Sequence, residues 1–96
     1  MKRMLFPLLL VAAAPAFAAD PLDCDKVGDQ ASDMIARRAG GLTERDALAE
    51  LSARGDYRLG FVVDGVFGAK PGASPAVTRA EIVQVCKHVN KTGSTY

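Results

Sequence analysis

The stretch PLDCDKVGDQASD, residues 21–33, holds four aspartates and one of the two cysteines of the chain. Aligned to a calcium-binding loop that starts at Asp23, it supplies carboxylates at the first and third ligand positions and a glycine at the sixth. The fifth position is Val27, and the twelfth, where a bidentate glutamate belongs, is Met34. Two carboxylates do not replace the hydration shell of calcium, so we expect no metal site here.

The same aspartates suit the beginning of a helix. Carboxylates in a first turn interact favourably with the positive end of the helix dipole, and either Asp20 or Asp23 can cap the first backbone N–H groups. Asp25, Asp29 and Asp33 then follow at intervals of four residues. We interpret these three side chains as a solvated acidic face and as the candidate surface for a partner or for a response to pH.

Side chains that commonly carry catalysis or bind zinc are sparse in this chain. The two cysteines and His88, the one histidine, give at most three zinc ligands, and Cys86 and His88 point to different sides of one helix. No serine or cysteine can be paired with His88 from its spacing, and no phosphate-binding glycine loop or haem-attachment motif is present. We expect no catalytic residue, no metal and no cofactor, and a small hydrolase is the least favoured function.

Residues 1–18 have the three parts of a secretory signal peptide. A basic Lys2-Arg3 start precedes a largely apolar run over residues 4–14, and Ala16-Phe17-Ala18 is an A-x-A cleavage site. The apolar run is too short to span a bilayer stably. We expect cleavage at the end of this site, with the bond after Ala19 as the alternative. The mature protein is then periplasmic or secreted and has no membrane contact.

Cleavage leaves 78 residues, which is one small domain. A domain of this size has difficulty burying enough apolar surface and is commonly held by a covalent or metal staple. In an oxidising compartment, the two cysteines predict a disulfide between Cys24 and Cys86, with two free thiols as the alternative. Closing a loop of this length removes unfolded-state entropy worth about 4 kcal/mol.

The mature chain lacks the charge pattern of a nucleic-acid-binding protein. Removal of Lys2 and Arg3 leaves ten basic residues against eleven acidic ones, a net charge of −1 with the histidine neutral. The two signs are interspersed, whereas a nucleic-acid partner needs a basic stripe. Arg37 and Arg38 are the densest basic point, and they fit the C-terminal end of a helix better than a phosphate site.

Hydrophobic spacing predicts an all-α protein, a small bundle of about four short helices closed by the disulfide. The first helix is expected over residues 22–39, with Gly40-Gly41 as its left-handed exit. Thr43 is the expected N-cap of a second helix over residues 44–54, which Gly55 ends. The apolar face expected for the second helix comprises Ala47, Leu48 and Leu51.

The last helix is expected to start at Ser74 as N-cap, with Pro75 at the first position, where a missing N–H does no harm. We expect it to fade near Asn90, which leaves residues 91–96 as a frayed tail and residues 19–90 as the helical domain. Antiparallel packing of the first and last helices would bring the two cysteines together.

The segment YRLGFVVDGVFG, residues 57–68, fits two structures. With a period of two, its apolar residues alternate and Asp64-Gly65 forms a hairpin turn. With the helical period, an apolar stripe forms, and Gly60 and Gly65 allow neighbouring helices to pack closely. The second arm of the hairpin would have three residues, and an isolated hairpin is marginally stable. We favour the helix and keep the hairpin as the alternative.

Four features of the sequence point to a family resemblance. They are Cys24, RAGGLT at residues 38–43, VVDGVF at residues 62–67, and Cys86. Together they resemble a loosely defined set of proteobacterial periplasmic proteins of unknown function. VTRAEIVQVCKH at residues 77–88 and LDCDKV at residues 22–27 are similar to the segments around the two cysteines of Hde-type periplasmic acid-stress chaperones. That resemblance implies an all-helical holdase with one disulfide. The aromatic residue near the first cysteine and the long lysine-rich tail of those chaperones are absent from this chain.

The sequence predicts a non-enzymatic exported protein that acts through contacts with an unidentified protein partner. An acid-stress chaperone is the first alternative, because protonation of the carboxylates leaves about ten positive charges whose repulsion can open the bundle. A periplasmic immunity-type inhibitor of a toxin is the second alternative, on the grounds of size and compartment.

Overall fold

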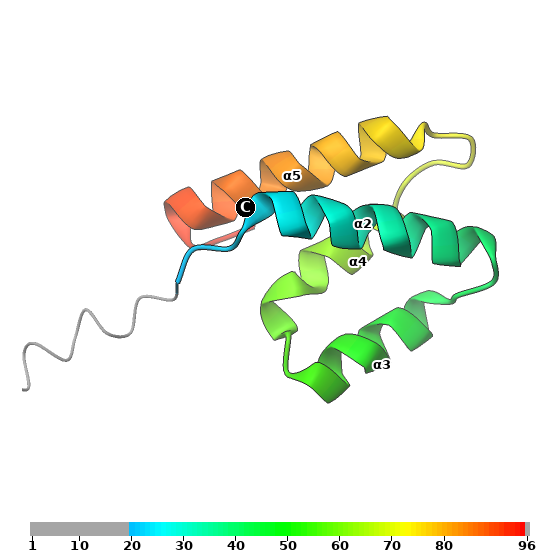
Figure 1. The fold of residues 1–96 in the computed structure, drawn as a ribbon, viewed down its shortest axis with the longest axis horizontal. Helices are drawn as coiled ribbons and strands as arrows, with labels where there is room; N and C mark the ends of the chain where they lie inside the picture. Colours follow the sequence, from blue (N-terminus) through cyan, green and yellow to red (C-terminus); the bar gives the residue numbers. More distant parts are fainter. Residues whose placement is uncertain (1–19, 96) are drawn as a thin grey trace, which may run out of the picture.

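The computed structural model describes residues 20–95, whose regular elements are all helices (Figure 1). The expected signal peptide, residues 1–18, lies outside the described residues. The elements are α2 (Cys24–Ala39), α3 (Glu44–Arg54), the 3-10 helix η3 (Tyr57–Leu59), α4 (Gly60–Phe67) and α5 (Pro75–Thr92). The predicted all-α fold with one disulfide is confirmed. Between residues 20 and 95, no helix is long and apolar enough to cross a membrane.

The arrangement of the helices places α4 at the centre. Helices α2 and α5 lie side by side and run in opposite directions, and α4 packs against both of them (Figure 1). Helix α3 packs on α4 and η3. Four of the eight residues of α4 are buried, on more than one of its faces, which is the pattern of a helix surrounded by others. The buried apolar residues are Val27, Ala31, Met34, Ala47, Leu51, Leu59, Phe61, Val62, Val63, Val66, Ile82 and Cys86.

Both ends of α2 follow from local hydrogen bonding. The Asp23 carboxylate accepts hydrogen bonds from the N–H groups of Asp25 and Lys26, so the helix begins at Cys24, two residues later than expected. At the other end, Gly41 has the left-handed backbone with φ 111°, whereas Gly40 has φ −88°. The predicted left-handed exit therefore depends on the second glycine alone.

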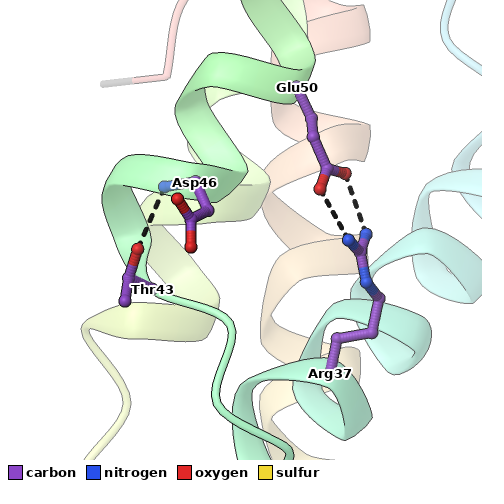
Figure 2. Close-up of polar contacts among 4 residues, drawn as sticks. All are labelled: Arg37, Thr43, Asp46 and Glu50. Carbon is purple, nitrogen blue, oxygen red and sulfur yellow. Dashed lines mark hydrogen bonds and ion pairs between the residues drawn. The ribbon is translucent and has the colours of Figure 1, made fainter.

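Helix α3 has the bounds expected from the sequence, residues 44–54. The hydroxyl of Thr43 accepts a hydrogen bond from the Asp46 N–H at 3.1 Å (Figure 2), and Gly55 ends the helix with φ 74°. The predicted apolar face is wrong at Leu48, which is 44% exposed. This helix lies at the edge of the bundle, and Ala47 and Leu51 are its buried residues.

The segment over residues 57–68 is helical, and the hairpin alternative is wrong. Val62, Val63 and Val66 are almost completely buried, because α4 has neighbours on several sides. A Cβ atom on Gly65 would lie 2.6 Å from Cγ1 of Ile82, so α4 and α5 approach closely at this glycine. Gly60 does not share this role, since a Cβ there would meet no atom within 4 Å.

Helix α5 differs from the expectation at both ends. Ser74 occupies the N-cap position with an extended backbone, and Pro75 is the first helical residue, but the Ser74 hydroxyl makes no capping hydrogen bond. The helix continues to Thr92, two residues beyond Asn90, and Gly93 ends it with φ 78°. The first two residues of the expected frayed tail are therefore helical.

The disulfide between Cys24 and Cys86 joins the start of α2 to the last third of α5, with a Cα–Cα distance of 5.7 Å. The two residues are 62 apart in the sequence, so the chain-entropy contribution is about 4 kcal/mol. Cys86 is fully buried in the core and Cys24 is partly buried against it, so the bridge lies at the border of the core.

Substitution of Gly65 by Ala tests the close approach of α4 and α5. The new methyl group overlaps Ile82, which is itself only 2% exposed, so we expect a loss of about 1–3 kcal/mol in the free energy of unfolding. Gly60→Ala is the matched control in the same helix, and we expect it to stabilise the protein by about 0.5–1 kcal/mol. Urea denaturation measures both. Equal effects of the two substitutions would contradict the proposed packing.

Candidate functional site

An open groove of about 1010 Å³ lies between η3 and α4 on one side and the C-terminal half of α5 on the other. We call it the α4–α5 groove. Its apolar lining includes Phe61, Val85 and Val89. Gly60 and Gly65 also line the groove, and at Gly60, where a Cβ would meet no atom within 4 Å, the lack of a side chain leaves it hollow. A large concave surface is therefore present, and no feature of the sequence indicated it.

The border of the groove carries two residue types that are enriched in protein-binding hot spots. Tyr57 is 74% exposed, the largest exposure among the large hydrophobic residues in the described part of the chain. Arg58 follows it in η3, and both line the groove. The ring of Tyr57 is largely apolar, so its contact with water is less favourable than contact with the apolar surface of a partner would be.

Two carboxylates also lie along the groove, those of Asp20 and Asp64. Neither makes an ion pair with any residue between 20 and 95. Arg58 is the one cationic side chain in the lining, and its Nη2 donates a hydrogen bond to the backbone carbonyl of Asp20 at 2.6 Å. The groove therefore has an apolar lining and a net negative border.

Asn90 fixes the segment that enters α2 against the end of α5. The Leu22 N–H donates a hydrogen bond to Oδ1 of Asn90 at 2.7 Å, and Nδ2 of Asn90 donates to the Leu22 carbonyl at 2.9 Å. Sequence reasoning missed this residue. Its spacing was an available signal, because Asn90 lies one helical turn after Cys86 and so shares a face with the disulfide.

The predicted acidic face is a row of exposed carboxylates along α2, outside the groove. Asp25, Asp29 and Asp33 are all exposed. Asp29 differs from the other two because it already forms an ion pair: its Oδ1 lies 3.0 Å from Nη2 of Arg79 on α5. The Arg79 guanidinium lies over Gly28, where a Cβ would meet its Cζ at 2.7 Å. Asp29 therefore links α2 to α5.

Other candidates from the sequence are not gathered into a site. Within residues 20–95, no group of three or more His, Cys, Asp or Glu side chains is placed to hold a metal ion. Both cysteines are in the disulfide. His88 is exposed on α5 and does not line the groove.

The two adjacent arginines of α2 reach to different helices. Arg37 donates two hydrogen bonds to the carboxylate of Glu50 on α3, at 2.9 and 2.6 Å (Figure 2). Arg38 donates to the carbonyl of Val66 in the last turn of α4 at 2.7 Å, and its guanidinium lies 5.2 Å from the centre of the Phe67 ring. Both side chains therefore fix neighbouring helices in addition to suiting the C-terminal end of their own.

The contact between Arg37 and Glu50 changes the acid–base behaviour of both groups. The hydrogen bond from Arg37 lowers the pKa of Glu50 below its ordinary value of 4.5, and the positive charges of Arg37 and Arg54 lower it further. The pKa of Arg37 is raised by the same hydrogen bond, by the Glu50 charge and, to a smaller extent, by Asp33. The link between α2 and α3 is therefore sensitive to acid.

No protein-family model matches the chain, and no curated protein or solved structure matches it either.

Replacement of Glu50 by Gln should remove a pH-dependent part of the stability. Because the folded-state pKa of Glu50 is lowered, the pair stabilises the fold above pH 4.5, and this contribution is lost as the pH falls through the lower folded value. The difference in Tm between wild type and Glu50→Gln should therefore be largest at about pH 7 and close to zero at about pH 2. Thermal unfolding followed by circular dichroism measures it.

Glu81→Gln is the control for this experiment. Glu81 is exposed on α5 and forms no ion pair with the rest of the described chain, so its replacement should change Tm little at either pH. A Tm difference for Glu50→Gln that is the same at both pH values would contradict the assigned role of the pair.

Proposed function

We propose that this chain is an exported, non-enzymatic protein that binds a partner protein in the α4–α5 groove. The observation that carries the proposal is the exposure of Tyr57 at the border of a large apolar groove. Tyr and Arg are enriched among the residues that dominate the binding energy of protein interfaces, and an exposed ring beside an apolar lining gives a partner a continuous apolar surface to cover.

The shape of the groove favours a protein segment over a small molecule. Pockets for small ligands commonly have volumes of about 300–1000 Å³ and surround most of the ligand surface. The α4–α5 groove is just above that range in volume, at about 1010 Å³, and it is open along one side. Apolar side chains of a partner can enter beside Phe61 and Val89 while its backbone stays at the surface.

The charges of the border indicate the chemistry of the partner. Asp20 and Asp64 offer two carboxylates that no residue between 20 and 95 neutralises, against one arginine that is already in contact with a carbonyl. We therefore propose an apolar segment that carries a flanking lysine or arginine.

The proposed compartment is the periplasm or the exterior of the cell. Disulfides persist in oxidising compartments, so the Cys24–Cys86 bridge supports export, in agreement with the signal peptide proposed for residues 1–18. The proposal that the protein is not an enzyme is supported by the engagement of both cysteines and by the position of His88 outside the groove.

A photoreactive amino acid at position 57, in cells that express the full chain, tests the groove directly. We expect it to crosslink one partner, and the same residue at position 45, exposed on α3, should not. With the purified partner, Tyr57→Ala should weaken binding by about 10- to 100-fold, and Asp64→Asn by a few-fold in a manner that high salt reduces.

Leu48→Ala is the matched control for Tyr57→Ala. It removes an exposed apolar side chain that lies outside the groove, and it should leave the affinity within about two-fold of wild type. The proposal fails if crosslinking at position 57 does not exceed that at position 45, or if Tyr57→Ala binds the partner as wild type does.

Acid-dependent binding of unfolded proteins is the second candidate. Two contacts between helices depend on carboxylates: Arg37 with Glu50 joins α2 to α3, and Arg79 with Asp29 joins α2 to α5. Acid protonates Glu50 while the basic residues stay charged, so the link between α2 and α3 weakens as repulsion between the positive charges grows.

An aggregation assay separates the two candidates. If the second holds, the oxidised mature protein suppresses aggregation of a model client at about pH 2–3 and not at about pH 7. Tyr57→Ala should then act as wild type does, because the client would bind surfaces exposed by opening of the bundle. Absence of suppression at low pH would exclude the chaperone candidate and leave the groove proposal standing.

A further inference from the structure

A second cavity of about 250 Å³ lies at the opposite end of α5 from the groove. It is formed where the C-terminal ends of α2 and α4 meet the connector over residues 68–74 and the first turn of α5. We call it the α5 N-terminal pocket. Its lining includes Ile35, Val66 and Pro75 as apolar residues, and Arg38, Lys70 and Thr78 as polar ones.

The charge of this pocket is entirely positive. Arg38 and Lys70 are the charged residues of its lining, and no carboxylate belongs to it. Lys70 forms no ion pair with any residue in the described range 20–95. Arg38 is held in place by the Val66 carbonyl and the Phe67 ring, which leaves most of its N–H groups unused. The small cavity is therefore lined by two cations, Arg38, which is held in place, and Lys70, which has no ion-pair partner among residues 20–95.

The start of α5 adds a positive dipole end to the same place. This helix has 18 residues, and its N-cap residue, Ser74, does not use its hydroxyl to cap it. Within the described chain, the N–H groups of Ala76 and Val77 donate to no acceptor, whereas that of Thr78 donates to the Ser74 carbonyl. An uncapped helix start of this kind favours a bound anion.

Thr78 is an independent indication that this pocket is a ligand site. It is 4% exposed and is the one buried polar side chain among residues 20–95. It lines the pocket, and no described residue forms a hydrogen bond with its hydroxyl. A buried hydroxyl without a partner destabilises a fold, and such groups commonly contact a water or ligand in the working protein.

We propose that the α5 N-terminal pocket binds a phosphate group, to which the Thr78 hydroxyl donates a hydrogen bond while Lys70 and Arg38 supply the opposite charge. The two cations match the charge of a phosphate, about −2 at neutral pH. The volume accommodates a free phosphate ion or a small phosphomonoester and is too small for a nucleotide. This site is independent of the α4–α5 groove.

The test is a titration of the oxidised, ¹⁵N-labelled mature protein, followed by its backbone amide resonances. Inorganic phosphate and phenyl phosphate are the two probes, and sodium chloride at equal ionic strength is the reference. We expect saturable shifts of the amides of residues 69–78, the two prolines excepted, and none in α3. Tighter binding of phenyl phosphate would assign the pocket to a phosphomonoester, and tighter binding of inorganic phosphate would assign it to the free ion.

Two variants examine the proposed ligands. Lys70→Gln and Thr78→Val should each weaken phosphate binding by about ten-fold, and Lys87→Gln, on the exposed surface of α5 outside the pocket, should not. In chloride, Thr78→Val should have a Tm equal to or above that of wild type, because it removes an unpaired buried hydroxyl without a change of shape. The weaker binding is then not a result of unfolding.

The proposal is overturned if neither phosphate compound produces saturable shifts beyond those of chloride. It is also overturned if Lys70→Gln and Thr78→Val both bind phosphate as tightly as wild type. A Tm of Thr78→Val well below that of wild type in chloride would show that the hydroxyl has a partner within the fold, and would remove the hydrogen bond on which the site depends.

Discussion

The close approach of α5 to α2 and α4 is the constraint on which the other features depend. On α4 it requires a glycine, because a Cβ on Gly65 would lie 2.6 Å from Cγ1 of Ile82, and on α2 a Cβ on Gly28 would press on the flexible end of Arg79 and on Val83. The disulfide between Cys24 and Cys86 then holds α2 and α5 together near one end. In so small a domain, tight packing and one long covalent loop supply stability that the limited core cannot supply alone.

The placement of α5 also creates both candidate binding sites. Its C-terminal half forms one wall of the α4–α5 groove, and its first turn closes the α5 N-terminal pocket. Each site contains one group that packing within residues 20–95 does not satisfy. At the groove it is the exposed ring of Tyr57, and in the pocket it is the buried hydroxyl of Thr78. Helix α3, in contrast, is held at the edge by a small apolar contact and by the acid-sensitive Arg37 and Glu50 pair.

Much of the helical pattern was predictable because its causes lie within one or two turns. The Thr43 cap and the Gly55 exit define α3 with the bounds 44–54, and a strong period of three and four marks the buried stripe of α2. Prediction failed where the answer depended on neighbours. Leu48 has the right spacing for a buried face and is exposed, because no helix among residues 20–95 covers that side of α3.

From the sequence alone came the all-helical class, the pairing of the two cysteines and most of the helix ends, since capping, periodicity and cysteine number are local or compositional properties. The tertiary structure decided that Asp29 joins α2 to α5 instead of standing free, and that Gly65, but not Gly60, allows a close approach. It also decided where the groove and the pocket lie. These features depend on contacts between residues far apart in the chain, and such contacts exist only once the helices have packed.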